Sequence, residues 1–506
     1  MTPPPPTLPA KLHPMVRAFL DSRDTVEATV SAFGSPVHLL FPQVYAENLA
    51  RLREVLDRRV PGHRICYAHK VNQSRAFVRV AERAGVSIDV SSPWEWAEAV
   101  DAGFGSARIE VTGPKGETFL RHLVGTGSTI NVDNLWELGR IAELADAAVP
   151  VLLRISGFDG TPISRFGVPP HRMDEAFDLL RAHRDRLAFL GFAFHLDSGE
   201  QAERVRAFDA CLGLVEQAYG YGLSPSVVNI GGGLRQVFTA DADRFDAYVG
   251  LLRESLLGRG APMSWAGNMF GYHVDGAAVH GVPVFHKYAN TLAADRLLDD
   301  LLTSPLDNHG GRSVAQVATD NLLTLWTEPG KALVDHAGIT VARVEFTKET
   351  ADGSELVHVD ISRDAVTPAD QEVMVDPILL PPVRDEFGSA SAGFAGASPR
   401  RARATADTGP LGVYIAGRLC LERDLITNHM VWLPRRPRPG DLLVFPNTAA
   451  YHMDLSAAAA SRHRPPAKVA VTRRGGVFHT CPDTEYEPDV AVAAEYPRVP
   501  RVNGAI

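Results

Sequence analysis

The sequence has few of the features that mark secreted or membrane proteins. Its four cysteines, Cys66, Cys211, Cys420 and Cys481, are too few and too scattered for a disulfide framework or a paired zinc motif. No run reaches the roughly 18 apolar residues of a membrane span. The opening MTPPPPTLPA lacks the charged and apolar regions of a signal peptide and reads as a loose polyproline tail. We therefore expect a cytoplasmic protein in a reducing environment, without a membrane partner.

An excess of positive charge is also lacking. The formal net charge is −9, which gives no general attraction to nucleic acid or anionic lipid. A small molecule is therefore the expected partner, and nucleic acid is not. The 506 residues are 45% hydrophobic and 22% charged, which indicates a globular chain of two or three domains rather than a disordered or fibrous one.

From about residue 60, short β-branched runs alternate with helical patterns, which is typical of βα units. The predicted helices between the runs include 93–102, 134–146, 170–185 and 200–220, whose apolar spacing suits helices packed on a parallel sheet. Eight such units favour a (β/α)8 barrel over an open sheet, and we assign it to residues 38–337. The eight predicted strands are RICYAH, VSIDVS, ARIEVTG, TINVD, PVLLRIS, LAFLGFAFHL, SVVNIGG and LLTLWTE.

Beyond about residue 338 the pattern changes to strands without long helices, which predicts a second, mainly antiparallel β domain over 338–506. The tail and segment 1–37 are expected to pack on this domain. Residues 389–410, rich in small, basic and Pro residues, are predicted to form a flexible surface loop. Residues 255–318, unusually rich in aromatic residues and His, look like an insertion over one mouth of the barrel. The strands expected in the β domain are ITVARVEF, ELVHVDIS, LGVYIAG, DLLVFP and KVAVTR.

Polar residues gather at the carboxyl ends of the predicted barrel strands. In such barrels function concentrates at this end, whereas the opposite face mostly supports stability. We therefore expect one cavity to receive side chains from six strands. The residues are Lys70 after the first strand, Asp89 and Ser91 at the second, Arg154 at the fifth, His195 and Ser198 at the sixth, Gly231, Gly232 and Gly233 at the seventh, and Glu328 at the eighth.

Lys70 is the residue with the most distinctive chemistry in this set. A lysine held at such a position loses hydration, which lowers its pKa and frees the amine to attack an aldehyde. This is Schiff-base chemistry. The alternative is an ordinary lysine at a strand end that reaches solvent.

Two segments predict an anion pocket beside a carboxylate. In NIGGG the glycine amides can approach a phosphate without a Cβ in the way, and phosphate sites in barrels often follow the seventh and eighth strands. TEPGKAL places Glu328, Gly330 and Lys331 next to this turn. Taken alone, the glycines could be a tight turn, His195 a core histidine and Ser198 a helix cap. In the β domain a lone Cys420 or Tyr451 would by itself be a packing residue.

Together these motifs resemble the fold-type III pyridoxal-phosphate enzymes, the group of ornithine and diaminopimelate decarboxylases whose barrel is shared with alanine racemase. The resemblance runs in order through most of the chain. The matching segments are YAHKVN, INVDNLWEL, SRFG, FHLDSG, NIGGG, EPGKALVDHAG and GDLLVFPNTAAY.

The resemblance implies a role for each matched residue. Lys70 would hold pyridoxal phosphate as an internal aldimine and later move a proton, and Glu328 would keep the pyridine nitrogen protonated so that the ring accepts electrons. His195 would stack on the ring, and Asp89 and Arg154 would also contact the cofactor. The residues implied around the phosphate are Ser198, Gly231, Gly232, Gly233, Gly330, Lys331 and Tyr451.

The implied reaction is decarboxylation of an amino acid, which leaves a carbanion at Cα that the ring delocalises and that a proton then converts to an amine. Cys420 matches a catalytic cysteine that related enzymes receive from the second subunit. The resemblance therefore implies a homodimer with shared active sites.

The chain departs from the family pattern where the substrate side chain would lie. Leu421 stands where an acidic residue usually follows the cysteine, and Glu422 comes one place later. Lys331 replaces an arginine and loses its bidentate fork, and Asn229 replaces an aspartate before the glycines. We expect Glu422, Asp424 and Asp360 to contact the substrate, whose identity the sequence leaves open. The chain also lacks the R-P-x-L-Y run of diaminopimelate decarboxylases.

Three other functions are weighed against decarboxylation. A racemase or carbon-carbon lyase could use the same scaffold, because the carbanion can also form by loss of a proton or an aldehyde. A catalytically silent regulator could keep the fold, but Lys70, Glu328 and Cys420 are retained. No H-E-x-x-H or comparable ligand spacing supports a metal hydrolase, and we expect no metal site.

Overall fold

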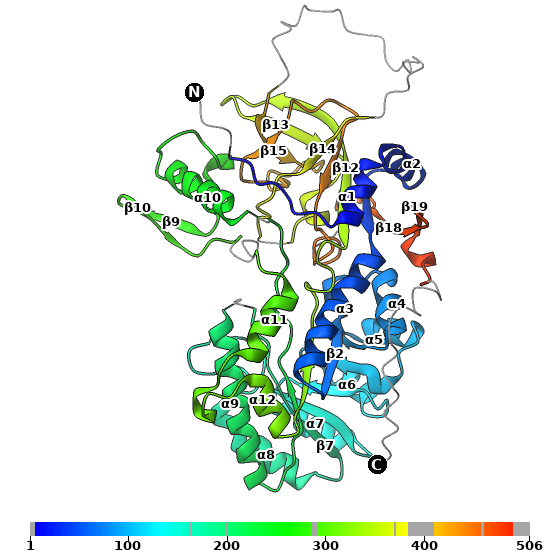
Figure 1. Ribbon diagram of the computed structural model, residues 1–506, viewed down its shortest axis with the longest axis vertical. Coiled ribbons are helices and arrows are strands. Elements are labelled where there is room, and N and C mark those ends of the chain that lie inside the picture. Colours follow the sequence, from blue (N-terminus) through cyan, green and yellow to red (C-terminus); the bar gives the residue numbers. More distant parts are fainter. Residues whose placement is uncertain are drawn as a thin grey trace, which may run out of the picture. The chain divides into compact units, whose positions relative to one another are not determined.

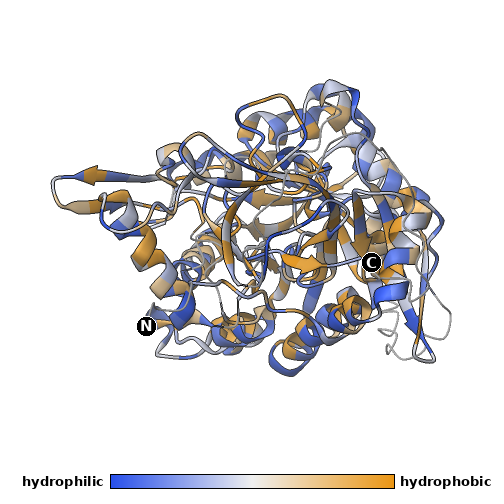
Figure 2. Ribbon diagram, turned by 90° about the horizontal axis from the view of Figure 1, so that it is seen from above, coloured by the Kyte–Doolittle hydropathy of each residue, from blue (hydrophilic) through white to orange (hydrophobic). Residues whose placement is uncertain are grey.

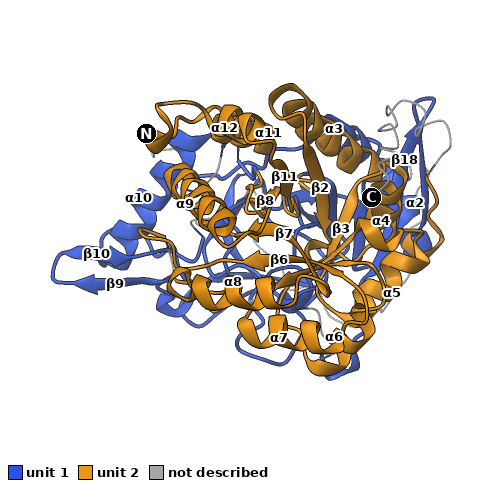
Figure 3. Ribbon diagram, turned by 90° about the horizontal axis from the view of Figure 1, so that it is seen from below, with its two compact units in different colours: residues 1–41, 237–291, 336–482 blue, residues 42–236, 292–335, 483–506 orange. Residues whose placement is uncertain are grey.

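The computed structural model divides the chain into two compact units (Figure 1, Figure 3). Unit 1 comprises residues 1–41, 237–291 and 336–482, and unit 2 comprises residues 42–236, 292–335 and 483–506. The structure describes residues 6–161, 163–197, 200–239, 241–285, 291–368, 371–382, 409–456 and 460–488. The chain passes between the units several times, whereas the sequence analysis expects three consecutive ranges.

Unit 2 contains a closed barrel of eight parallel strands (Figure 3). Neighbours pair in the ring order β11-β2-β3-β4-β5-β6-β7-β8, and β11 closes the ring because it pairs with both β8 and β2. Each strand coincides with one of the eight runs predicted from the sequence, although β2 and β6 begin one residue before theirs. The strands are β2 His63–Ala68, β3 Ser87–Val90, β4 Ile109–Val111, β5 Thr129–Val132, β6 Val149–Arg154, β7 Leu187–Ala193, β8 Val227–Asn229 and β11 Thr324–Thr327.

Helices surround this barrel on the outside (Figure 3). Side chains directly after the strands cap several of them: Ser92 accepts a hydrogen bond from the Glu95 amide, and Asn134 accepts one from the Glu137 amide. These caps fix where the helix begins after each strand. The helices are α3 Pro42–Arg59, α4 Arg75–Arg83, α5 Pro93–Asp101, α6 Glu117–Leu123, α7 Leu135–Leu144, α8 Met173–Ala182, α9 Gln201–Gly220, α11 Ala294–Thr303 and α12 Val314–Asp320.

The barrel interior is packed with side chains, so the barrel is not a pore. Cys66, Leu152, Ala193, Val227 and Trp326 form one buried cluster contributed by five strands. Apolar residues also recur along the strands and along the covered sides of the helices (Figure 2). The core therefore holds the carboxyl ends of the strands in fixed positions, which is what a site at that end requires.

Unit 1 is built on a mainly antiparallel sheet. Its path runs β16-β15-β13-β12-β1-β18-β19, with β17 paired to β12 and β14. Two pairs, β1 with β18 and β13 with β15, are parallel. The strands are β1 Val37–Leu40, β12 Gly338–Glu349, β13 Glu355–Val359, β14 Ile378–Leu380, β15 Leu411–Ala416, β16 Val431–Leu433, β17 Leu442–Phe445, β18 Ala467–Arg474 and β19 Val477–Pro482.

Residues 38–40 belong to this sheet, although the sequence analysis assigns them to the barrel range. The strand β1 pairs along its length with β12 and with β18, so its backbone hydrogen bonds are made in unit 1. Unit 1 also holds α1 Pro14–Asp21 and α2 Arg23–Phe33. The amide of Leu8 donates to Asp376 at 2.6 Å, which fixes the segment before α1 within the same unit.

The aromatic segment 255–318 is divided between the units. Its first part belongs to unit 1, with α10 Ala242–Leu256 just before it and the hairpin of β9 Tyr272–Asp275 and β10 Ala278–Gly281 within it. Trp265 donates its amide to Asn428 and its ring packs edge-on against Tyr414. The second part returns to unit 2, where Asp299 of α11 pairs with Arg59 of α3 at 2.8 Å.

The predicted (β/α)8 barrel and the predicted, mainly antiparallel β domain are both confirmed. The predicted flexible loop over 389–410 lies almost entirely outside the described residues. No helix among the described residues has the length and apolar character needed to cross a membrane.

Candidate active site

The structure places the predicted residues of unit 2 at one end of the barrel. Lys70 lies in the single turn His69–Val71 directly after β2, Asp89 lies in β3, and Arg154 ends β6. His195 follows β7 and Glu328 follows β11. All the strands are parallel, so these side chains share the carboxyl end. Ser198 lies outside the described residues, and Ser91 donates through its amide and hydroxyl to Glu95.

Two buried carboxyl groups face the Lys70 amine. Burial raises the pKa of Asp89 to about 8, with a further increase from Glu328, while Lys70 and a 2.7 Å hydrogen bond from Thr112 act in the opposite direction. Burial also raises the pKa of Glu328, against the lowering effects of Lys70 and Arg154. The lysine therefore lies in the field of two carboxyl groups that are themselves shielded from water.

Asn229 and Glu110 complete this buried group, and neither was among the predicted site residues. The Asn229 side-chain amide donates to Glu328 Oε1 at 2.8 Å and to Glu110 Oε1 at 2.9 Å. Asn131 donates to the same Glu110 oxygen at 3.0 Å. The sequence signal that could have found Glu110 is its place between Ile109 and Val111, because alternation in a strand sends the middle residue to the opposite face.

His195 is held as a neutral imidazole. Burial lowers its pKa to about 3, and the positive charges of Lys70, Arg154 and Arg204 lower it further, against the raising effect of Asp197. Its Nδ1 accepts a hydrogen bond from the Gly232 amide at 3.2 Å. The ring can therefore lie beside an aromatic ligand without placing a positive charge against it.

The glycine turn Gly231–Gly233 has no room for side chains. A Cβ at Gly232 would overlap the carbonyl oxygen of Glu328, and one at Gly231 would overlap that of Phe194. Gly231 and Gly233 also adopt φ of +66° and +77°, which glycine adopts at no steric cost. The Gly231 amide donates to Asn229 and the Gly232 amide to His195, so both of these amides are engaged within the barrel.

Arg204 of α9 is a third residue of this region that was not among the predicted site residues. It is buried, and its guanidinium donates to the carbonyls of Leu196 at 2.5 Å and Gly232 at 2.8 Å. Burial lowers its pKa to about 10. Arg204 thus joins the loop after β7 to the glycine turn after β8 and adds positive charge there.

Lys331 and Gly330 lie beside the same turn. The Lys331 amine pairs with Asp197 at 2.6 Å. A Cβ at Gly330 would lie within 3.1 Å of the Val71 side chain and 3.3 Å of the Ala68 side chain, so this glycine allows the loop after β11 to approach the Lys70 turn closely.

Unit 1 holds the predicted residues Cys420 and Glu422, both exposed, on the loop between β15 and β16. The buried Asp424 organises their turn: its oxygens accept the amides of Leu419 at 2.6 Å and Arg363 at 2.7 Å. Asp424 therefore supports the loop that presents Cys420.

Asp360 and Tyr451 lie elsewhere in unit 1. Asp360 accepts the Arg343 amide at 2.8 Å, and burial raises its pKa. Tyr451 is half-buried with φ of +67°, a conformation that is uncommon for a residue other than glycine and that often marks functional sites.

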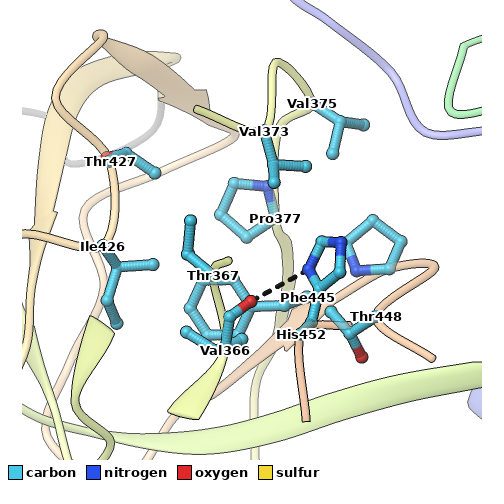
Figure 4. Close-up of a pocket in the computed structure, with 11 residues that line it drawn as sticks. Val366, Thr367, Val373, Val375, Pro377, Ile426, Thr427, Phe445, Thr448 and His452 are labelled. Atoms are coloured by element: carbon cyan, nitrogen blue, oxygen red, sulfur yellow. Dashed lines mark hydrogen bonds between the residues drawn. The ribbon is translucent and has the colours of Figure 1, made fainter. Parts of the chain in front are cut away.

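A small cavity of about 20 Å³ lies within unit 1, away from the predicted residues (Figure 4). Val366, Ile426 and Phe445 line it, and His452 Nδ1 lies 3.0 Å from the Val366 carbonyl. It has room for about one water molecule. In the described part of the chain, no group of three or more His, Cys, Asp or Glu is arranged to hold a metal ion.

The donor set of the barrel fits pyridoxal phosphate. Lys70 would supply the amine for its aldehyde, Glu328 a carboxyl for its pyridine nitrogen, and His195 a neutral ring for its face. Arg204 and Lys331 would supply positive charge near the glycine turn, whereas the charge of Arg154 acts on Glu328 and His195. The fold and these residues together define a barrel enzyme of the pyridoxal-phosphate class.

Comparison with known proteins gives the family. Residues 46–262 match the model of the pyridoxal-dependent decarboxylase pyridoxal-binding domain. An uncharacterized protein, y4yA, of Sinorhizobium fredii is 34% identical over 459 residues, covering 89% of this chain and 91% of the relative. The diaminopimelate decarboxylase of Methanothermobacter thermautotrophicus is 28% identical over 264 residues, covering 47% of this chain and 60% of that enzyme.

Solved structures show the same fold. The diaminopimelate decarboxylase of M. jannaschii, in complex with L-lysine, gives a TM-score of 0.63 at 18% identity and covers 90% of each chain. The arginine decarboxylase of Paramecium bursaria Chlorella virus, bound to agmatine, gives 0.61 at 16% identity over 89% of this chain and 100% of that one.

The chain belongs to the fold-type III pyridoxal-phosphate-dependent decarboxylase family. The predictions of family, enzyme class and cofactor are confirmed: the protein is a pyridoxal-phosphate-dependent amino acid decarboxylase. The roles of the individual site residues stay predictions.

Proposed function

We propose that this enzyme releases carbon dioxide from the Cα of an amino acid and returns a proton to the same carbon, giving an amine. The observation that carries the proposal is the placement of the Lys70 amine at the barrel mouth, in the field of Asp89 and Glu328. When bound, pyridoxal phosphate supplies an electron sink for the negative charge left on Cα. The residues of the chain bind, orient and move protons around it.

In this proposal Lys70 binds the aldehyde and afterwards carries the proton. The Lys70 amine interacts with both Asp89 and Glu328, so groups that can exchange a proton with Nζ lie beside it. Glu328, oriented by Asn229, holds the pyridine nitrogen in its protonated state. His195 covers one face of the ring, and its low pKa keeps that face uncharged.

The substrate side chain is proposed to lie near Cys420 and Glu422. Leu421 and Glu422 are exposed, so this loop offers one apolar and one acidic side chain. Both oxygens of Asp424 accept hydrogen bonds from backbone amides, and Asp360 accepts one as well. Because these two side chains are used within unit 1, we propose that Glu422 is the acid that contacts the substrate. The proposal names no particular amino acid.

We also propose that the active enzyme is a cytoplasmic homodimer. Cys420 would then act in the barrel of the second copy, where it would donate a proton at Cα. Support comes from its exposure on a turn that Asp424 fixes.

Lys70→Ala tests the cofactor assignment. The purified enzyme is expected to show the absorbance band of pyridoxal phosphate joined to a lysine amine, and Lys70→Ala is expected to lose this band because the nearby Lys331 amine is paired with Asp197. Lys348→Ala, an exposed lysine of β12, is the matched control and should keep the band. A band that survives Lys70→Ala would reject the assignment.

A substrate screen tests the reaction. Each candidate amino acid is incubated with the enzyme, and carbon dioxide and amine are followed by mass detection. Release of an aldehyde, or inversion at Cα without gas, would show that the chain is instead a lyase or racemase on this scaffold. A silent screen with an intact absorbance band would point to a regulator.

A further inference from the structure

Asn229 connects two carboxyl groups across the barrel interior. It ends β8, whereas Glu110 lies in β4, four places away around the eight-stranded ring in either direction. Both side chains are buried, with exposures of 0% and 1%. The hydrogen bond from Asn229 to Glu110 therefore spans the barrel between opposite strands, and the second hydrogen bond reaches Glu328 beside β8.

The orientation of the Asn229 amide is fixed by its third partner. Its Oδ1 accepts the Gly231 amide at 2.9 Å, so the NH2 group must face the two carboxyl groups and gives one hydrogen to each. An ionised aspartate in the same place would instead turn oxygen lone pairs toward Glu110 Oε1 and Glu328 Oε1 and could donate a hydrogen bond to neither. The amide is thus the residue type that this pair of acids requires.

The charges around Glu110 differ from those around Glu328. Lys70 and Arg154 act on Glu328, but the charged groups that act most strongly on Glu110 are Glu328 and Asp89, both acidic. Burial and these two neighbours raise the pKa of Glu110 well above its ordinary value, against the lowering effects of the nearby Cys66 thiol and of the Asn131 side chain.

Glu110 is also incompletely hydrogen-bonded. Its Oε2 has no hydrogen-bond partner among the residues that the structure describes. A carboxylate oxygen in this position would be a buried charge without compensation, which is costly, whereas a protonated carboxyl avoids that charge.

We propose that Glu110 is a positioning residue of the barrel site: as a neutral acid it orients Asn229, and Asn229 in turn holds Glu328 as the ionised carboxylate that faces the cofactor. This inference rests on the proposed function for the role of Glu328. The link between Glu110, Asn229 and Glu328 itself needs no cofactor.

The first experiment exchanges acid and amide. Asn229→Asp is expected to weaken binding of pyridoxal phosphate to the full chain by about tenfold or more, because an ionised aspartate has no hydrogen to donate to the Glu328 carboxylate and adds a negative charge beside it. Asn229→Asp with Glu110→Gln is expected to recover most of this loss, since the exchange restores the number of acids and places an amide opposite the new one. Absence of recovery would overturn the proposal.

Asn131→Asp is the matched control for this exchange. It adds the same group beside Glu110, but Asn131 has no hydrogen bond to Glu328. Its effect on cofactor binding is expected to be several-fold smaller than that of Asn229→Asp. An equal effect would show that added charge alone, rather than the link to Glu328, weakens binding, and would overturn the positioning role.

The second experiment needs no cofactor. A buried acid with a raised pKa keeps its proton to a higher pH in the folded chain than in the unfolded chain. Its contribution to stability is therefore fully present below the ordinary pKa of the unfolded chain, and it is lost as pH rises through the pKa of the folded chain. Asp89, whose pKa is about 8, acts in the same direction. The urea midpoint of the cofactor-free chain is therefore expected to fall with rising pH.

Glu110→Gln keeps the shape of the neutral acid and removes its proton. The fall in the urea midpoint between about pH 5 and about pH 8 is expected to be smaller by about a third or more in this variant. An unchanged fall would show that Glu110 is not the proton-bearing acid. This measurement uses no ligand, so its outcome does not depend on the proposed function. Failure of the proposed function would be seen separately, as an absorbance band that survives Lys70→Ala.

Discussion

Gly232 is a residue at which the glycine turn lies against the backbone of Glu328, whose side chain is proposed to face the cofactor. Its missing side chain lets the turn lie against the carbonyl of Glu328, the residue that follows β11. Gly232→Ala is expected to lower the free energy of unfolding by about 1–3 kcal/mol, because the added methyl group forces two backbone segments apart. Urea unfolding measures the loss of stability, and a titration with pyridoxal phosphate measures any change in cofactor binding.

Gly213→Ala is the control for this substitution. Gly213 lies inside α9 with open space around its Cα, so alanine there is expected to raise stability by up to about 1 kcal/mol without changing cofactor binding. Equal behaviour of the two variants would contradict the close approach at Gly232.

The residues that could be read from the sequence are those at strand ends. Lys70, His195 and Glu328 follow the ends of apolar runs. Because the predicted strands are parallel, these residues could be placed at the same end of the barrel. Glu110 was missed, although Asp89, which has the same central position in β3, was predicted. The runs IDV, IEV and INV at 88–90, 109–111 and 130–132 have the same apolar-polar-apolar pattern, and in each the central side chain is buried and hydrogen-bonded to other buried polar groups.

At the scale of elements, the turn between β15 and β16 depends on one buried carboxylate. Asp424→Ala is expected to cost about 1–3 kcal/mol of stability, because the amides of Leu419 and Arg363 lose their acceptors. The same variant is expected to reduce turnover more than cofactor binding, since the turn presents Cys420.

Two comparisons check this element. Asp424→Asn keeps side-chain oxygen at the turn and should lose less stability than Asp424→Ala. Glu422→Gln, an exposed change on the same loop, should leave the urea midpoint within experimental error while altering the KM for the substrate. If the turnover of Asp424→Ala equals that of the wild type once it is calculated per folded molecule, the proposal that Asp424 positions Cys420 would be wrong.

Elements were predicted well where periodicity is strong and poorly where pairing partners are distant in sequence. All eight barrel strands were recognised, because each lies in a short run of β-branched and apolar residues that alternates with a helical pattern. The short strands β1 and β14 were not, since hydrogen bonds to partners far along the chain define them. The strands β16 and β19 were missed as well, although they pair with the preceding strands β15 and β18. The aromatic segment was taken as one insertion, but α11 and α12 return to the barrel unit.

At the scale of the whole molecule, the proposed homodimer makes a quantitative prediction. Lys70→Ala and Cys420→Ala are each expected to be inactive or nearly so. If one site uses Lys70 of one copy and Cys420 of the other, a mixed dimer regains one intact site of two. After subunit exchange of equal amounts, about a quarter of the wild-type activity is expected.

Mixing two portions of the same variant is the control and should restore nothing. Light scattering on each sample reports whether dimers are present. Dimers that exchange subunits without any regain of activity would show that each site is completed within a single chain.

The ring order also affects how the protein is made. Because β11 alone pairs with both β2 and β8, a nascent chain that has emerged only as far as residue 236 has seven barrel strands and two open sheet edges. About ninety further residues must leave the ribosome before the last strand can join them, and during that interval the exposed edges can pair with other chains. We therefore expect stalled or truncated translation products ending before Thr324 to aggregate, whereas products that include Thr327 can close the cylinder.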